Sequence, residues 1–316
     1  MDKSIVVLMS TYNGEPYIRE QLDSIVKQKD VSFKLLIRDD GSSDRTPEIL
    51  SEYSRNYDNI DFINRDNIEN KGFNRSFLSL LEEGLKREKK CKYFAFADQD
   101  DVWFENKLKS ALDYINFKND KSGTKDNALL YYYANKYWTD ENLNIIAEDD
   151  FSYCRDNYFD LFMLPPVYGC TSVISRELAA KSLELAGNNK LLYDVYIFRL
   201  ACLLGGTIIS DRSPKMYYRR HGKNASGDAM KFSIITSVKK YIKEPNGMHG
   251  VKNYILPIYD LHKDEMPSKQ KLLCELIISN ERKIYCKCRL LCWKDAYKRG
   301  LKASIMWIGR VLLNAI

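Results

Sequence analysis

Three carboxylates occupy four consecutive positions directly after an apolar run: Tyr93–Ala97 precedes Asp98, Asp100 and Asp101. An apolar run of this length is typical of a strand buried on both faces of a parallel sheet. The carboxyl ends of such strands form the ligand-binding edge of an open α/β sheet. Neighbouring carboxylates repel one another unless a cation binds between them. Carboxylate oxygens are preferred ligands of Mg²⁺ and Mn²⁺, which commonly bridge them to the phosphates of a substrate. The alternative is a solvated acidic turn that caps a helix beginning near Trp103, because Asp is a favoured N-cap.

Polar residues also follow two earlier apolar runs, at 5–9 and 33–37. After the first come Ser10, Thr11, Tyr12 and Asn13, and after the second come Asp39 and Asp40. The hydroxyls and the ring suit a nucleoside, and a carboxylate can accept the imide N–H of a pyrimidine. The alternatives are an ordinary strand-to-helix loop for the first segment and an Asx-type turn for the second.

Two further groups lie later in the chain. Arg219, Arg220 and His221 form a compact cationic cluster. Arginine pairs bind diphosphate oxygens, and a neutral imidazole can ligate a metal; a surface basic turn is the alternative. Asp194 opens an apolar helix. It fits either a partner of the helix dipole or a general base that faces a cleft.

Alternating strands and helices must position these residues. We expect strands at 5–9, 33–37, 60–64 and 93–97, and helices at 17–27, 47–57, 73–85 and 105–117. This alternation predicts an α/β fold whose parallel sheet carries helices on both faces, with the loops after the strands at one edge. Later we expect strands at 128–137, 169–174, 207–210 and 216–219, and helices at 176–186 and 191–204.

Charge divides the chain unevenly. The formal net charge is +6, yet from Glu281 onward nine Lys and Arg face two acids. We therefore expect a catalytic domain over residues 1–228 and a basic, helical C-terminal region over residues 229–316. The last run, 303–316, is shorter than the ~20 apolar residues of a membrane span. It fits a helix lying on an anionic membrane surface or a helix packed on the domain, and both stay open.

The cysteines and the start of the chain bear on its compartment. No secretory leader precedes Ser4, and the eight cysteines form no paired metal motif. This predicts a cytoplasmic protein with reduced thiols. The basic tail lacks the stacking motifs of nucleic-acid binders, so no nucleic acid is expected as a partner.

Taken in order, these motifs resemble those of the family 2 glycosyltransferases with the GT-A fold, over about residues 3–225. The strings that carry the resemblance are Ser10-Thr11-Tyr12-Asn13-Gly14, Arg38-Asp39-Asp40-Gly41-Ser42-Ser43-Asp44, Asn70-Lys71-Gly72-Phe73, Asp98-Gln99-Asp100-Asp101-Val102-Trp103, Gly169-Cys170-Thr171, Tyr193-Asp194 and Tyr218-Arg219-Arg220-His221-Gly222. The fourth and last strings are most similar to those of bacterial rhamnosyltransferases that build surface polysaccharides. The resemblance implies a Rossmann-like, mostly parallel central sheet flanked by helices, with a C-terminal helical extension.

The resemblance also implies roles for single residues. Asp194 would be the catalytic base, and Asp100 would hold Mn²⁺ or Mg²⁺ with His221, Asp98 and Asp101 as further ligands. The donor would be bound by Ser10, Thr11, Tyr12, Asn13, Asp39, Asp40, Asn70, Gly72, Asp98, Arg219 and Arg220.

The implied reaction is inverting transfer of one sugar from a nucleotide-sugar donor to a saccharide or lipid-linked acceptor, with contact to the cytoplasmic membrane surface. dTDP-L-rhamnose is the first choice of donor. The Gln-x-x-Arg-Trp motif of processive synthases is absent, which favours single transfers. The alternatives are a UDP-hexose or UDP-N-acetylhexosamine donor, or an inactive sugar-binding or assembly protein. Ser10–Gly14 lacks the glycine-rich loop of a nucleotidyltransferase and the G-x-G-x-x-G of a dinucleotide oxidoreductase.

Overall fold

The computed structural model describes residues 5–66, 69–122, 128–148, 167–185, 191–222, 251–279 and 284–294. It also describes residues 304, 307, 308, 311 and 312. The strands are β1 (Ile5–Thr11), β2 (Phe33–Asp39), β3 (Ile60–Phe62), β4 (Tyr93–Ala97), β5 (Val102–Trp103), β6 (Leu130–Thr139), β7 (Ile145–Glu148), β8 (Ser172–Ser175) and β9 (Thr207–Arg219). The helices are α1 (Ile18–Val26), α2 (Thr46–Asn56), α3 (Phe73–Arg87), α4 (Lys107–Ser122), α6 (Arg176–Ser182), α7 (Tyr193–Leu203), α9 (Val251–His262), α10 (Ser268–Ser279) and α11 (Ile284–Leu291), with 3₁₀ turns η2 (Gly169–Thr171) and η3 (Leu183–Leu185).

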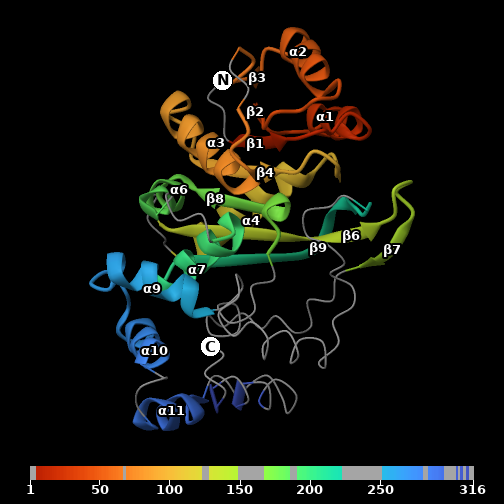
Figure 1. Cartoon of the computed structure of the whole chain (residues 1–316). Helices are drawn as coiled ribbons and strands as arrows, with labels where there is room; N and C mark the ends of the chain where they lie inside the picture. The colour runs from red at the N-terminus through yellow and green to blue at the C-terminus, as the bar shows by residue number, and fades with distance from the viewer. Residues whose placement is uncertain are drawn as a thin grey trace.

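One central sheet runs through the molecule in the order β3-β2-β1-β4-β8-β6-β9-β5, with β7 paired to β6 (Figure 1). The first four strands in this order are parallel, as the sequence predicts. Met9 lies opposite Ile37 on one side and Ala97 on the other. This register brings the residues that follow the three strands to one edge of the sheet.

The pairing changes beyond β4. Strand β8 runs antiparallel to both β4 and β6, β9 is parallel to β6, and β5 is antiparallel to β9. The predicted α/β class is confirmed, with a mixed sheet in its second half. Because β8 is reversed, its first residue lies at the edge where β4 ends, and η2 enters the sheet there.

Several predicted boundaries are wrong in this second half. The expected strands at 207–210 and 216–219 form one strand, β9, whose register with β6 shifts near Asn135. The expected strand at 169–174 begins as the turn η2, and the expected helix at 176–186 ends at Ser182. The two-residue β5 and the exposed β7 are not predicted at all. The boundary expected at residues 228/229 lies outside the described residues.

Helices cover both faces because the strands are apolar on both. On one face of β1, Ile5, Val7 and Met9 pack in a core with α1, α2 and α4. On the other face, Val6 and Leu8 share a core with α3, α6 and α7. Burial of every one of these side chains is what a parallel strand covered on both faces requires.

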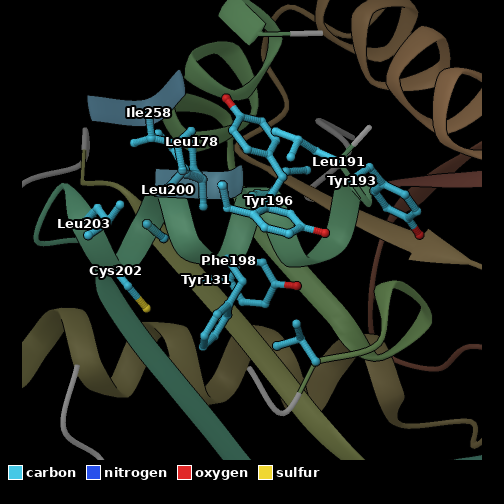
Figure 2. Close-up of a cluster of buried hydrophobic side chains, with 14 of the residues drawn as sticks. Tyr131, Leu178, Leu191, Tyr193, Tyr196, Phe198, Leu200, Cys202, Leu203 and Ile258 are labelled. Carbon is cyan, nitrogen blue, oxygen red and sulfur yellow. The ribbon is translucent and has the colours of Figure 1, made fainter. Parts of the chain in front are cut away.

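The C-terminal helices continue the second core. Tyr254, Ile255 and Ile258 of α9 pack in the cluster that contains Tyr196 and Leu200 of α7 (Figure 2). Helices α9, α10 and α11 lie at the end of the molecule away from α2 (Figure 1).

The last run also contacts this core at two of its described positions. Trp307 and Val311 are buried, and the Trp307 indole N–H donates to the Leu290 carbonyl at 3.0 Å. These positions favour a helix packed on the domain over a helix lying on a membrane surface. Among the residues that the structure describes, no helix combines the length and apolar character needed to cross a bilayer.

Candidate active site

The acidic turn after β4 is fixed on both sides. Ala97 is fully buried at the end of β4, and Val102 and Trp103 form β5, which pairs with β9. Trp103 therefore lies in a strand, and the next helix, α4, begins only at Lys107. The alternative reading of this turn as the cap of a helix near Trp103 is wrong.

The carboxylates of this turn are crowded and largely shielded from water. Burial raises the pKa of Asp98 to about 7, and the charge of Asp100 adds to the rise. Burial also raises the pKa of Asp101 well above its ordinary value, with Asp100 and Asp98 as further causes. Asp101 is 1% exposed. Such a cluster is stabilised by a neighbouring cation.

The surroundings of the Asp101 carboxylate fit a divalent metal at this turn. Asp101 Oδ1 accepts the backbone N–H of Arg219 at 3.3 Å, whereas the buried Oδ2 has no hydrogen-bond partner among the described residues. Ligand atoms of Asp98, Asp101 and Cys170 lie within 4.8 Å of one another. Hard carboxylate oxygens are the donors that Mg²⁺ and Mn²⁺ prefer.

His221 meets the same turn from the end of β9. Its Nε2 lies 2.7 Å from a carboxylate oxygen of Asp100. The imidazole also stacks on the Tyr17 ring, with centroids 4.8 Å apart. The two residues expected as metal ligands, His221 and Asp100, are therefore in direct contact.

Arg219 has a different place from the one expected. It is 3% exposed, and its Nε donates to the Asp100 carbonyl at 2.9 Å. Its two terminal nitrogens donate to the Glu141 carbonyl and the Glu20 carboxylate. With its donors directed at protein oxygens, Arg219 supports the acidic turn, and this arrangement does not fit the expected diphosphate contact. Arg220 is half-buried, with its guanidinium 5.8 Å from the Trp138 ring centroid.

The loops after β1, β2 and β4 converge, as the sequence predicts. The backbone N–H of Asp40 donates to the Thr11 carbonyl at 2.7 Å. The Gln99 side chain accepts from the Tyr12 N–H at 2.8 Å and donates to the Tyr12 carbonyl at 2.9 Å. Gln99 thus joins the loop after β1 to the acidic turn.

Asp39 and Thr11 are structural. Asp39 is fully buried and accepts from the Thr11 hydroxyl at 2.8 Å, from the Gly41 and Ser42 N–H groups, and from the Ser42 hydroxyl. This is the Asx-type turn that was the alternative reading. Both side chains are buried and bonded to one another and to neighbouring groups of the protein, so the expected donor contacts of Thr11 and Asp39 do not fit the structure.

Asp40 orders the next loop. Its Oδ1 accepts from Arg38 at 2.6 Å and from the Lys71 N–H at 2.7 Å. That loop carries Asn70 and Gly72, and Gly72 has φ +74°, which a glycine adopts at little cost.

Several of the expected donor-binding residues are accessible at this edge. Tyr12 is 51% exposed, Asn13, Asn70 and Gly72 are also exposed, and Ser10 is half-buried. These side chains and the Gly72 backbone are open to a donor.

Asp194 reaches the same region from the first turn of α7. Its carboxylate accepts the N–H of Val195 at 2.8 Å and of Gly169 at 3.1 Å, and burial raises its pKa. Gly169 precedes Cys170, whose sulfur lies within 4.8 Å of carboxylate oxygens of Asp98 and Asp101, so one turn borders both Asp194 and the acidic turn. Asp194 is therefore both a helix-terminal acceptor and a member of the site.

Tyr193 fixes the position of Asp194. It stacks on Phe77 with centroids 4.5 Å apart and contacts Phe96 at 5.1 Å. Figure 2 shows Tyr193 at one end of the buried cluster, at the opposite end from Leu203. A Cβ at Gly169 would lie 1.9 Å from the Tyr193 hydroxyl, so only glycine fits there. These ring contacts of Tyr193 hold the backbone at Asp194.

Sequence reasoning missed four residues of this site: Tyr17, Glu20, Gln99 and Lys107. Gln99 lies within the acidic string, where its polar side chain was a usable signal. Tyr17 is the residue before α1 and Glu20 lies in its first turn, and only the fold brings them to the end of β9.

Comparisons with known proteins identify the family of this chain. The model of the family described as Glycosyl transferase family 2 matches residues 6–180. The chain is 34% identical over 232 residues to the dTDP-rhamnosyl transferase RfbG of Shigella flexneri, covering 71% of this chain and 75% of that protein. It is 31% identical over 152 residues to an uncharacterized glycosyltransferase of Methanocaldococcus jannaschii, spanning 47% of each chain.

Among solved structures, TarS 1-349 of S. aureus in complex with UDP-GlcNAc gives a TM-score of 0.57 at 15% identity, covering 99% of this chain and 82% of that chain. At this identity the likeness shows the fold alone, and it confirms the predicted GT-A architecture.

Proposed function

Because the chain belongs to glycosyltransferase family 2, we propose that it transfers one sugar from a nucleotide-sugar donor to a saccharide acceptor in cell-surface polysaccharide synthesis, with inversion at the anomeric carbon. The donor we propose is dTDP-L-rhamnose. This choice is supported by the relative named a dTDP-rhamnosyl transferase, which aligns over 71% of the chain.

One observation carries the proposal: the Gly169–Thr171 turn contacts both Asp194 and the carboxylates of the acidic turn at one edge of the sheet. The acidic turn supplies a crowded anionic cluster with an orphaned oxygen, and Asp194 supplies a carboxylate whose pKa is raised by burial. A donor bound by its diphosphate at the turn would place its sugar near Asp194.

Asp194 acts as general base in this proposal. It takes the proton of the attacking acceptor hydroxyl while the bond from sugar to diphosphate breaks. A carboxylate with a raised pKa is a stronger base than an exposed one, and such catalysis contributes about 10²–10⁴-fold. The two backbone N–H donors from Val195 and Gly169 keep its carboxylate oriented.

Other residues bind the donor. The nucleoside lies against Tyr12, Asn13 and Ser10, with Asn70 and Gly72 beside it and Asp40 ordering their loop. We assign the diphosphate contact to Arg220, which is half-buried next to Trp138. A divalent cation, Mn²⁺ or Mg²⁺, held by Asp98, Asp100, Asp101 and His221, would neutralise charge on the leaving nucleoside diphosphate.

The acceptor we propose is a lipid-linked saccharide at the cytoplasmic face of the membrane. The excess of Lys and Arg after Glu281 supports a peripheral contact with anionic lipid. The helical C-terminal region would then hold the catalytic edge near its acceptor.

A donor panel tests the proposal. Nucleotide release is measured from dTDP-rhamnose, UDP-hexoses and UDP-N-acetylhexosamines, with Mn²⁺, with Mg²⁺ and with EDTA. We expect fastest release from dTDP-rhamnose and none in EDTA. Release from a UDP-sugar alone would replace the donor, and no release from any donor would favour a sugar-binding or assembly protein.

Asp100→Ala tests the metal assignment. We expect it to abolish release, because it removes the carboxylate paired with His221. Asp113→Ala, on the exposed face of α4, is the matched control and should remain active. Full activity of Asp100→Ala would refute the metal role.

A further inference from the structure

A lysine is buried beneath the acidic turn. Lys107, the first residue of α4, is 3% exposed. Lysine is almost never fully buried unless its charge has partners. Its ammonium donates to the Cys170 carbonyl at 2.5 Å and to Met216 Sδ at 3.0 Å, and lies 4.3 Å from the Trp103 ring centroid. One side chain thus contacts β5, η2 and β9.

The same Cys170 borders the carboxylates. Its sulfur lies within 4.8 Å of carboxylate oxygens of Asp98 and Asp101, while its carbonyl accepts from Lys107. Burial lowers the pKa of Lys107 to about 8, and the negative charges of Asp101 and Asp98 oppose that fall. Cys170 thus borders the ammonium through its carbonyl and the two carboxylates through its sulfur, in a region largely shielded from water.

Lys107 is also linked to Asp194, the proposed base for the acceptor hydroxyl. Cys170 belongs to η2, and the preceding residue of that turn, Gly169, donates its N–H to Asp194 at 3.1 Å. The chain of contacts runs from Lys107 through two consecutive residues to the proposed base. A shift of the ammonium would move the turn that holds Asp194.

We propose that Lys107 is the internal counter-cation of the acidic turn and a positioning residue that locks this turn to the Gly169–Thr171 turn. The inference rests on the proposed function only where it assigns a divalent cation to Asp98–Asp101. Without a metal, the ammonium offsets the repulsion between the carboxylates. When a metal ion is bound, its positive charge and that of Lys107 lie close together and repel. Lys107 therefore weakens metal binding and raises the metal concentration needed to fill the site.

A double-mutant cycle in EDTA tests the counter-cation alone. Lys107→Met keeps the length of the side chain and removes its charge, and it should lower Tm by roughly 5–10 °C. Asp101→Asn in the Lys107→Met background should recover a large part of that loss, because the uncompensated charge is gone. Lys109→Met, which removes an exposed lysine of the same helix, should leave Tm nearly unchanged.

Equal effects of Asp101→Asn in both backgrounds would show no coupling and would overturn the proposal. If Lys107→Met does not fold, the folded double variant compared with Asp101→Asn still reports the coupling.

A Mn²⁺ titration, followed by Tm without any sugar donor at neutral pH, where the Lys107 ammonium is mostly charged, tests the competition. Lys107→Met should bind Mn²⁺ at least about tenfold more tightly than the wild type and Lys109→Met. An equal or weaker Mn²⁺ response would overturn this part. Absence of any Mn²⁺ response in all three proteins would instead count against the metal in the proposed function, and the EDTA cycle would stand.

Discussion

Replacing Asp194 with Asn removes the proposed base and changes little else. The Asn carbonyl can accept one of the two N–H donors, from Val195 or Gly169, so the fold loses about 1 kcal/mol of hydrogen bonding. Loss of a negative charge at the start of α7 adds about 0.3–1 kcal/mol. These terms together predict a Tm lower by only a few degrees.

Turnover should respond far more strongly. Loss of general base catalysis predicts a fall in kcat of about 10²–10⁴, which is roughly 3–5 kcal/mol of barrier. The donor contacts lie on other elements, so donor affinity should change less than about threefold, within the ~0.6 kcal/mol of a thermal fluctuation. We would measure kcat from nucleotide release and donor affinity by calorimetry on the same preparations.

The pH profile gives an independent readout. A base acts only when ionised, and burial raises the pKa of Asp194. The acidic limb of kcat/KM should therefore lie above the ~4 of an ordinary carboxyl. This limb should vanish in Asp194→Asn.

Glu177→Gln is the matched control, because Glu177 is a half-buried carboxylate in the first turn of α6. It should lose the same small stability and keep its turnover. The reasoning fails if Asp194→Asn keeps more than about a tenth of wild-type kcat, well outside the range of base catalysis, or if donor affinity falls as far as kcat.

Two predictions concern stability. Asp39→Ala should lower the free energy of unfolding by about 3 kcal/mol or more, since it leaves the Thr11 hydroxyl and two backbone N–H groups without their acceptor; urea unfolding measures this, and an unchanged midpoint would contradict the structural role. Trp307→Ala should lower the free energy of unfolding by about 3–5 kcal/mol, because the indole is buried against Leu290. Liposome co-sedimentation of this variant should not change. Reduced sedimentation of a variant with wild-type Tm would instead show that Trp307 contacts the membrane.

The first half of the fold was predictable because its signals are local. The bounds of β4 at Tyr93–Ala97 follow from an apolar run that is buried on both faces. The second half depends on pairing between distant segments. Nothing in Val102 and Trp103 alone indicates a strand; their backbone is extended because β9 lies beside them.

The site divides along the same line. That the loops after β1, β2 and β4 meet follows from parallel topology. That Asp39 turns inward while Asp40 orders a neighbouring loop does not, since both are the same residue type after the same strand. Lys107 was missed because a lysine at the start of a helix is ordinarily a solvated residue, and its burial depends on Cys170 and Met216.

The reversal of β8 explains how a single edge serves both partners of the proposed reaction. In a sheet that stayed parallel, the segment entering β8 would lie at the opposite edge from the acidic turn. Because β8 runs antiparallel to β4, η2 enters at the edge where β4 ends. There its Cys170 carbonyl meets Lys107 and its Gly169 N–H holds Asp194. The change from parallel to mixed pairing is therefore the structural step that brings the proposed base to the carboxylates of the donor side.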